Sequence, residues 1–244
     1  MNRSTAYGAA LLTMSAVQPA CAVDFKASGR AMFGSVYRVE AQDTRLLNTL
    51  NAGAAGLTGL NTAGANADDA NLNFRRGDAT TTALKAYLDL GLRHDGFSAL
   101  VRVKAWHDFA LAGHPRAWGN VANGYAAGDP LSDAGAPPLS RFSGVVLSEA
   151  WVEQAVDAGR WRLLARAGQQ TLNWGDRVGL GGGLEALNPR DLPALRRAGA
   201  VPQETRVPIP ALFGRIELDR ALALEGFYET AFRPAALDMC GTFW

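Results

Sequence analysis

The chain has 244 residues, of which 48% are hydrophobic, a composition that suits one globular domain, a small pair of domains or a membrane β-barrel. Its 24 lysines and arginines balance 23 acidic residues, so the net charge gives no support for a nucleic-acid partner. The longest apolar runs fall short of the roughly 18 to 20 residues that a membrane-spanning helix needs, which excludes a helical membrane protein.

The first 22 residues have the layout of a cleavable signal peptide. Arg3 supplies the positive start, the run AYGAALLTMSAV supplies the apolar middle, and an ACA tripeptide supplies a small-residue cleavage site before Val23. We therefore expect an exported protein whose mature chain retains only Cys240. A lone cysteine can form no internal disulfide, and neither thiol catalysis nor a cysteine-based metal site has support.

Seven stretches of the mature chain alternate polar and apolar residues with the period of two that is typical of β-strands. They cover residues 29–41, 81–94, 97–109, 145–157, 160–172, 206–219 and 222–233. They are about 12 to 14 residues long, whereas globular strands usually have about 5 to 6 residues and a tilted membrane-spanning strand needs about 9 to 11. The lengths favour strands that cross a membrane.

The predicted connections alternate between short and long. The dipeptides DG (95–96), AG (158–159) and RA (220–221) make the short ones, and residues 42–80, 110–144 and 173–205 make the long ones. Short periplasmic turns and long extracellular loops are typical of an outer-membrane β-barrel. A soluble periplasmic β-sandwich that binds a ligand is the alternative, although sandwiches seldom combine such long strands with such long loops.

The expected fold is therefore all-β, an antiparallel transmembrane β-barrel that occupies residues 23–244. In such barrels the short turns face the periplasm, so the seventh strand would end on the outside. A bacterial single-chain barrel closes with an even number of strands. We therefore expect the barrel domain to be incomplete at its C-terminus, unless one weak strand is hidden in the pattern.

The third long loop begins with a corner after the fifth strand. The corner consists of Asn173, Trp174, Gly175 and Asp176. The glycine-rich run GLGGG that follows lacks the G-x-G-x-x-G spacing and the strand–helix context of a phosphate-binding loop. We interpret it as a flexible connection.

The same loop continues with the run NPRDLPALRR, which predicts one short helix. Asn188 is a plausible N-cap, Pro189 suits the first helical position, and Asp191 lies near the positive end of the helix. Arg196 and Arg197 lie near its negative end. A short helix in a long loop can fold into a barrel mouth and narrow it, or it can be surface structure, and the sequence leaves both possibilities open.

One face of the predicted strands is charged and would line the barrel lumen. Its members are Lys85, Asp89, Arg93, Arg102, Lys104, Glu149, Glu153, Arg162 and Arg166. These side chains could pair across strands and fill a narrow barrel, or they could line a path for a solute. The tryptophans at 106, 118, 151, 161 and 174 include candidates for an aromatic girdle at the membrane interface, although Trp151 and Trp174 could instead pack in the lumen or a loop.

The sequence offers no catalytic constellation. His107 and Asp108 alternate along a strand and face opposite sides, so they cannot form a dyad with each other. The runs DPLSD and NADDAN lack the spacing of an EF-hand. We therefore expect no enzyme, no cofactor and no metal site.

Several runs carry a resemblance to a known family. The runs GQQTLNWGD, LNPRDLPALRRAGAVPQE and FYETAFRPAALDMCGTF resemble the uncharacterised Gram-negative outer-membrane family known as domain of unknown function 1302, and GSVYRVEAQD and NLNFRRGD are similar to its N-terminal region. Ala198 departs from the family pattern, in which a proline is common after the paired arginines, and Trp244 lies where the family chain runs on. The resemblance implies a longer outer-membrane barrel.

The resemblance also implies a role in moving hydrophobic compounds beside transporters of the resistance-nodulation-division type. We therefore expect a channel or transport component for hydrophobic or amphipathic small molecules, in contact with outer-membrane lipid and with such an export system as a partner. A structural or assembly partner without a solute path is the alternative. The resemblance supplies neither an agreed substrate nor catalytic residues.

Overall fold

The seven strands form one antiparallel sheet in which each strand pairs with its neighbours in sequence. The computed structural model describes residues 23–62, 64, 68–120, 123–174 and 187–244, so the predicted signal peptide and part of the third long loop lie outside the described residues. The strands are β1 (Asp24–Tyr37), β2 (Ala79–His94), β3 (Phe97–Asp108), β4 (Ser143–Ala158), β5 (Trp161–Gln170), β6 (Ile209–Glu217) and β7 (Ala223–Glu229).

Alternation of polar and apolar residues produces this sheet, as predicted, and the boundaries of β2 to β5 lie within about two residues of the expected ones. The expected start and end of the first strand were wrong: β1 is Asp24–Tyr37 rather than 29–41. The regular ladder ends after Tyr37, although the Arg38 backbone still exchanges hydrogen bonds with Gly77 and Asp78, and the Arg38 guanidinium donates to the carbonyl oxygens of Glu40 and Ala70 at 2.8 Å each. The side chain thus fastens the loop instead of extending the strand.

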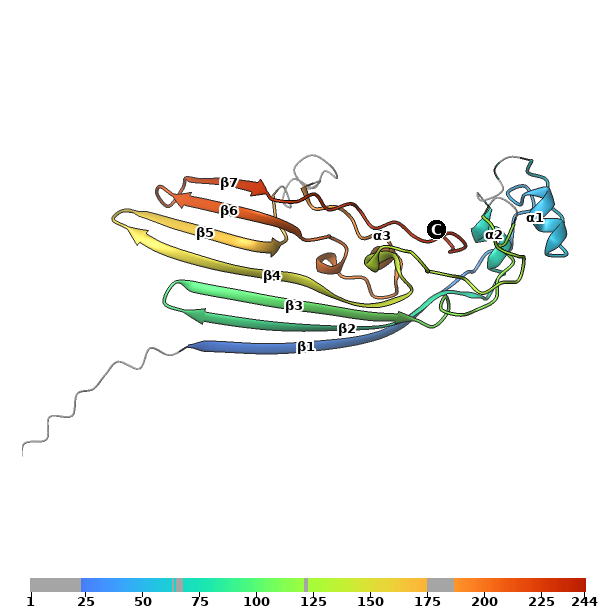
Figure 1. Ribbon diagram of the computed structural model, residues 1–244, viewed down its shortest axis with the longest axis horizontal. Helices are drawn as coiled ribbons and strands as arrows, with labels where there is room; N and C mark the ends of the chain where they lie inside the picture. Colours follow the sequence, from blue (N-terminus) through green and yellow to red (C-terminus); the bar gives the residue numbers. More distant parts are fainter. Residues whose placement is uncertain (1–22, 63, 65–67, 121–122, 175–186) are drawn as a thin grey trace, which may run out of the picture.

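The short connections gather at one end of the sheet (Figure 1). Asp95 and Gly96 have φ values of 42° and 76°, the positive pair that a type I′ turn requires. The second turn lies one residue later than predicted, at Gly159 and Arg160. The third was predicted too short: residues 218–222 connect β6 to β7, because the Asp219 side chain accepts hydrogen bonds from two backbone amides of this loop.

The long loops and the C-terminal segment (residues 230–244) gather at the other end and contain most of the buried apolar side chains. The loops contain α1 (Thr49–Ala54), α2 (Asp69–Asn73) and α3 (Leu192–Arg196), with short 3₁₀ turns at Pro138–Ser140 and Pro202–Glu204. One apolar cluster joins Trp118, Leu131 and Phe142, and Met239 of the C-terminal segment packs against it. Within the described residues, no helix has the length and apolar character to cross a membrane.

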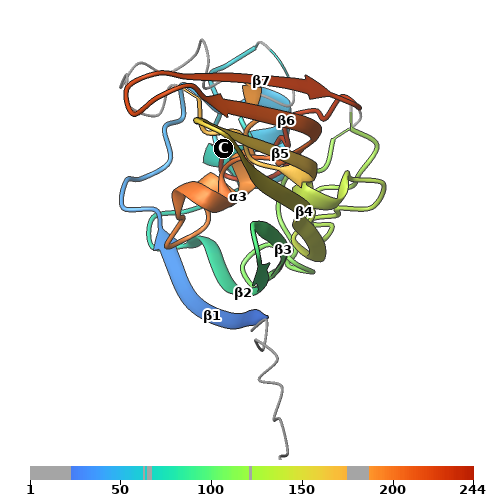
Figure 2. The same cartoon turned by 90° about the vertical axis from the view of Figure 1, so that its left-hand side faces the viewer.

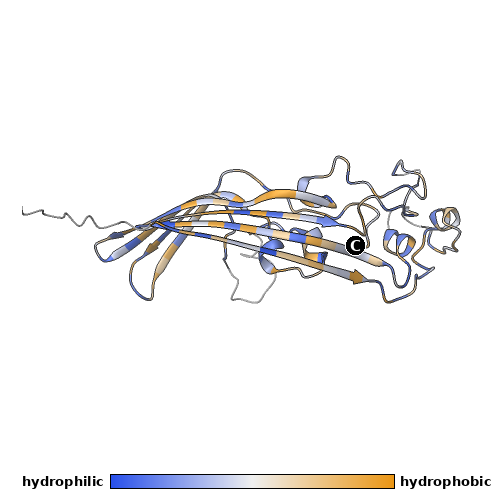
Figure 3. Cartoon of the chain, turned by 90° about the horizontal axis from the view of Figure 1, so that it is seen from below, coloured by the Kyte–Doolittle hydropathy of each residue, from blue (hydrophilic) through white to orange (hydrophobic). Residues whose placement is uncertain are grey.

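The sheet is strongly curved, and α3 lies inside the curve (Figure 2). The described strands lie in this single sheet rather than in two sheets packed face to face. Polar and apolar residues alternate along the strands (Figure 3), so the concave and convex faces differ in character. The predicted all-β antiparallel architecture is therefore confirmed, and the sheet is open, with β1 and β7 at its edges.

Candidate functional site

The concave face of the sheet carries the predicted charged residues. The register aligns Asp89 with Arg102 and Arg102 with Glu149, so all three side chains point to the same face. Arg102 donates to both carboxylate oxygens of Asp89 at 2.8 Å and lies 3.3 Å from Glu149. These cross-strand pairs tie β2, β3 and β4 together across the concave face.

A second group of pairs lies on β4 and β5. Arg166 contacts Glu153 at 2.5 Å and lies with its guanidinium 4.3 Å from the ring centre of Trp151. A planar guanidinium on an indole face is a favourable arrangement, and the carboxylate holds it there. Arg162 is only 4.0 Å from Asp157, and both side chains are exposed. Arg93 makes no ion pair with any residue that the structure describes.

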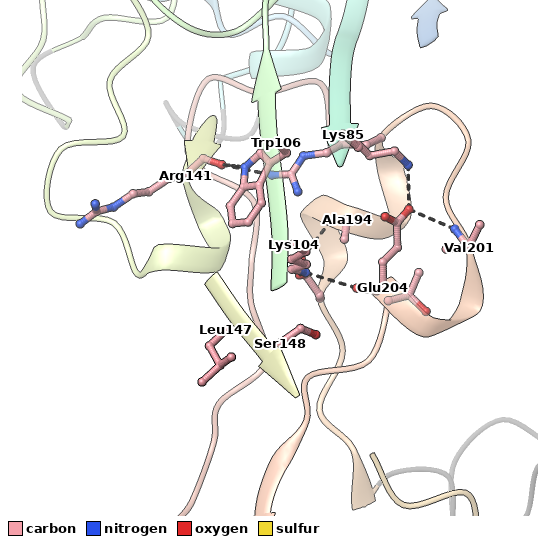
Figure 4. A network of polar contacts seen from close by, with 12 residues as sticks. Lys85, Lys104, Trp106, Arg141, Leu147, Ser148, Ala194, Val201 and Glu204 are labelled. Carbon is pink, nitrogen blue, oxygen red and sulfur yellow. Dashed lines mark hydrogen bonds and ion pairs between the residues drawn. The ribbon is translucent and has the colours of Figure 1, made fainter. Parts of the chain in front are cut away.

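Lys85 and Lys104, the two remaining members of the predicted set, are buried at the loop end of the concave face. They are covered by residues 187–205, which we call the inner segment, although this segment lies between β5 and β6 in the sequence (Figure 4). Lys85 Nζ contacts Glu204 Oε1 at 2.7 Å and donates to the Gly199 carbonyl oxygen at 2.9 Å. Lys104 Nζ contacts Asp191 Oδ2 at 2.6 Å.

The carboxylates of the inner segment also shape the segment itself. Asp191 Oδ1 accepts from the Ala194 amide at 3.0 Å, which makes Asp191 the N-cap of α3. Glu204 Oε1 accepts from the Val201 amide at 3.0 Å and closes the 3₁₀ turn. Each carboxylate therefore folds the segment and fastens it to a lysine, so that the shape of the segment and its attachment depend on the same atoms.

The predicted start of the helix was wrong. Asn188 does not cap it, because its side-chain amide pairs with the backbone of Leu172, accepting from the amide at 3.1 Å and donating to the carbonyl at 2.5 Å. Pro189 precedes the helix, where its carbonyl accepts from Val207, and the proline in the first turn is Pro193. Asn188 instead attaches the start of the inner segment to Leu172, just after β5.

The paired arginines lie at the end of the helix, as predicted. Arg197 lies over the Trp106 ring at 4.7 Å and donates to the Arg141 carbonyl oxygen at 3.1 Å. Arg196 forms an ion pair with Asp238 of the C-terminal segment. Burial is the main influence on two of these groups, since it lowers the pKa of the Arg197 guanidinium and raises the pKa of the Asp238 carboxyl.

Two of the corner residues can be placed, whereas Gly175 and Asp176 lie outside the described residues. Asn173 accepts a hydrogen bond from Arg206 at 2.9 Å, and Trp174 packs edge-on against Phe227 at 5.1 Å. The corner therefore contacts the residues that lead into β6 and packs on β7. Of the five tryptophans considered above, Trp161 lies on the convex face beside a turn and is 43% exposed.

Sequence reasoning missed two carboxylates that make ion pairs at the inner segment. Glu204 and Asp238 were not predicted to pair with anything, and Trp106 was considered only as a girdle residue. No periodic pattern could have revealed these contacts, because Glu204 lies 119 positions after its partner Lys85. Among the residues that the structure describes, no cluster of three or more His, Cys, Asp or Glu side chains could hold a metal ion.

Comparison with family models identifies one match, described as "Protein of unknown function (DUF1302)", which covers residues 3–244. The chain belongs to this family. The match confirms the resemblance carried by the loop and strand motifs, the inner-segment run included. No curated protein matches the chain, and no solved structure does.

Proposed function

We propose that the curved sheet is the wall of an outer-membrane β-barrel, with its convex face against lipid. The observation that carries this proposal is the difference between the two faces of the sheet. The large apolar side chains that point outward are exposed: Phe25, Phe33, Leu84, Leu88, Val101, Val145, Leu147, Val152, Val156, Leu163, Leu212, Ile216, Leu224 and Tyr228. A contiguous apolar surface of this extent is rare on a monomeric soluble protein and is typical of a lipid-facing wall.

The arrangement of the connections supports the same proposal. Short turns gather at one end and long, structured loops at the other, as in barrels whose turns face the periplasm. A cleavable signal peptide would deliver the chain to that compartment. The charged concave face would then be the wall of the lumen.

Within this barrel, we infer a channel or transport component for hydrophobic or amphipathic small molecules. The inner segment covers the loop end of β2 and β3, where it would narrow the lumen without covering the ion pairs of β4 and β5. A protein whose lumen is fully closed, acting as a structural or assembly partner, is the second candidate. The buried ion pairs of the inner segment favour it, because they hold that segment firmly in the lumen.

Two adjacent residues of β1 provide a matched test of the membrane orientation. Ala27 points to the convex face and Ser28 to the concave face, and both are exposed. Ala27→Arg would place a charge in lipid, at a cost that reaches about 2–4 kcal/mol at the bilayer midplane and is smaller toward the interfaces, whereas Ser28→Arg would place it in the lumen. We expect only Ala27→Arg to reduce the amount of folded protein in outer membranes. Equal effects of the two substitutions would contradict the proposed orientation.

The transport function requires a separate measurement. The protein, reconstituted in planar bilayers and in vesicles, is expected to conduct ions or to admit a hydrophobic fluorescent probe. A correctly inserted protein that does neither would favour the structural partner. Retention of a transporter protein on the purified barrel would then be the next measurement.

A further inference from the structure

A groove of about 420 Å³ lies on the concave face between the Arg102 ion pairs and the turn end of the sheet. Its floor is a row of cross-strand neighbours, in which Gly91 pairs with Leu100 and Leu100 pairs with Trp151. The volume falls within the roughly 300–1,000 Å³ of typical small-molecule sites. The groove is separate from the inner segment, which covers the opposite end of β2 and β3.

The groove exists because Gly91 has no side chain in the middle of a charged wall. A Cβ atom at this position would meet only the carbonyl oxygens of Lys26 and Ala99, at 3.8 and 4.0 Å. These are ordinary van der Waals distances, so the strand geometry itself does not require a glycine here. Leu100 and Trp151 then supply an apolar floor on a face that is otherwise dominated by ion pairs.

The rim of the groove carries more positive than negative charge outside its ion pairs. Asp89 is bonded to Arg102 through both of its oxygens. Lys26 and Arg93 also line the groove and make no ion pair with any described part of the chain, although Asp24, the remaining carboxylate on the rim, lies directly opposite Arg93 in the register of β1 and β2. Outside the Asp89–Arg102 pair, the rim therefore carries two cations and one carboxylate, an excess of one positive charge next to an apolar floor.

We propose that this groove binds a small amphipathic anion, with a carboxylate or sulfonate on Lys26 and Arg93 and an apolar body on Leu100 and Trp151. The inference rests on the proposed function, because it places a solute-binding site on the lumen wall. It also narrows the solute class, since a cationic amphiphile would meet an excess of positive charge on the rim and bind more weakly than an anion. A neutral solute would gain only the contacts of the apolar floor.

The test fills the groove without disturbing the strand. Gly91→Val adds a strand-favouring side chain over the floor, and Gly29→Val adds the same side chain on the convex face of β1, where a Cβ would lie 3.6 Å from the Tyr87 carbonyl oxygen. The full protein is kept in solution with an amphipathic polymer, and binding of 4-phenylbutyrate is measured by calorimetry. Folding of each variant is checked by circular dichroism.

We expect Gly91→Val to weaken the binding of 4-phenylbutyrate at least about tenfold. Gly29→Val should leave the affinity of the protein for this anion unchanged. The wild-type protein should bind 4-phenylbutylamine at least about tenfold more weakly than the acid. The Lys26→Gln/Arg93→Gln variant should lose this preference but still bind 4-phenylbutanol. Equal binding by the two glycine variants, or equal binding of acid and amine, would overturn the proposal.

The groove and the transport function can fail separately. A protein that admits solutes across a bilayer, but whose binding of 4-phenylbutyrate is unaffected by Gly91→Val, would retain the function and lose the site. A protein that binds the anion in this groove, but passes nothing across a bilayer, would retain the site and lose the transport function.

Discussion

The ion pair between Lys85 and Glu204 leads to a quantitative prediction about the inner segment. Both side chains are 2% exposed, and the ammonium group lies 2.7 Å from the carboxylate. Lys85→Met leaves the Glu204 carboxylate buried without its counter-ion, which costs about 3–5 kcal/mol in proteins. Since about 1.4 kcal/mol corresponds to a tenfold change, the open form of the segment should become about a hundredfold to several thousandfold more populated.

Hydrogen exchange of the amides of Asp191, Leu195 and Arg197 measures this opening, because each donates to a carbonyl of the inner segment or of α3. Lys26→Met is the matched control, since it removes a lysine from the same face that makes no ion pair with the described residues. Adding Glu204→Gln to Lys85→Met should restore much of the protection, because the amide keeps an acceptor for Val201 and carries no charge. The reasoning is refuted if Lys85→Met and Lys26→Met change these exchange rates equally.

Two further predictions concern a strand and the C-terminal segment. Gly168 has a φ of 130°, and a Cβ atom there would lie 2.7 Å from Trp151 Cα. Gly168→Ala should therefore lower the free energy of unfolding, measured in urea, by about 1–3 kcal/mol. Gly226→Ala is the control and should leave this free energy unchanged, because a Cβ atom at Gly226 would meet nothing within 4 Å. Burial raises the pKa of Asp69 to about 6 from 3.8, and its carboxylate accepts from the Gly241 amide at 2.6 Å. Docking of the C-terminal segment should therefore be strongest below about pH 4 and weaken as the pH rises through 6. A fluorophore on the exposed Cys240 would follow it, and Asp69→Asn should reduce the change, although the raised pKa of Asp238 in the same segment leaves part of it. A constant signal in the wild-type protein would contradict the shifted pKa.

The sequence predicted the strands well wherever alternation of polar and apolar residues alone determines them, as in β2 to β5. The sequence-based prediction of element boundaries failed where a polar side chain forms hydrogen bonds outside the element to which it was assigned. Arg38 continues the alternating pattern, but its guanidinium bonds loop carbonyls, and β1 ends at Tyr37. Asn188 has the identity of an N-cap but pairs with Leu172, so Asp191 caps the helix instead.

The charged face could be predicted, because a period of two assigns every second residue to one side of a sheet. Which of its charged side chains pair with each other could not be predicted in the same way. Asp89 and Arg102 are joined by a hairpin, so their pairing follows from the register set by the turn. Lys85 and Lys104 find their partners in a segment that crosses the concave face, and local periodicity contains no information about such a crossing.

The long separation between the wall lysines and their partners also bears on how the protein assembles. Lys85 and Lys104 precede Glu204 and Asp191 by 119 and 87 positions, so β2 and β3 can form before the carboxylates reach them. During that interval each ammonium group can stay hydrated, whereas an apolar side chain at the same position would expose hydrophobic surface that promotes aggregation. The two lysines would thus remain hydrated on the β2–β3 hairpin until the carboxylates of the inner segment reach them.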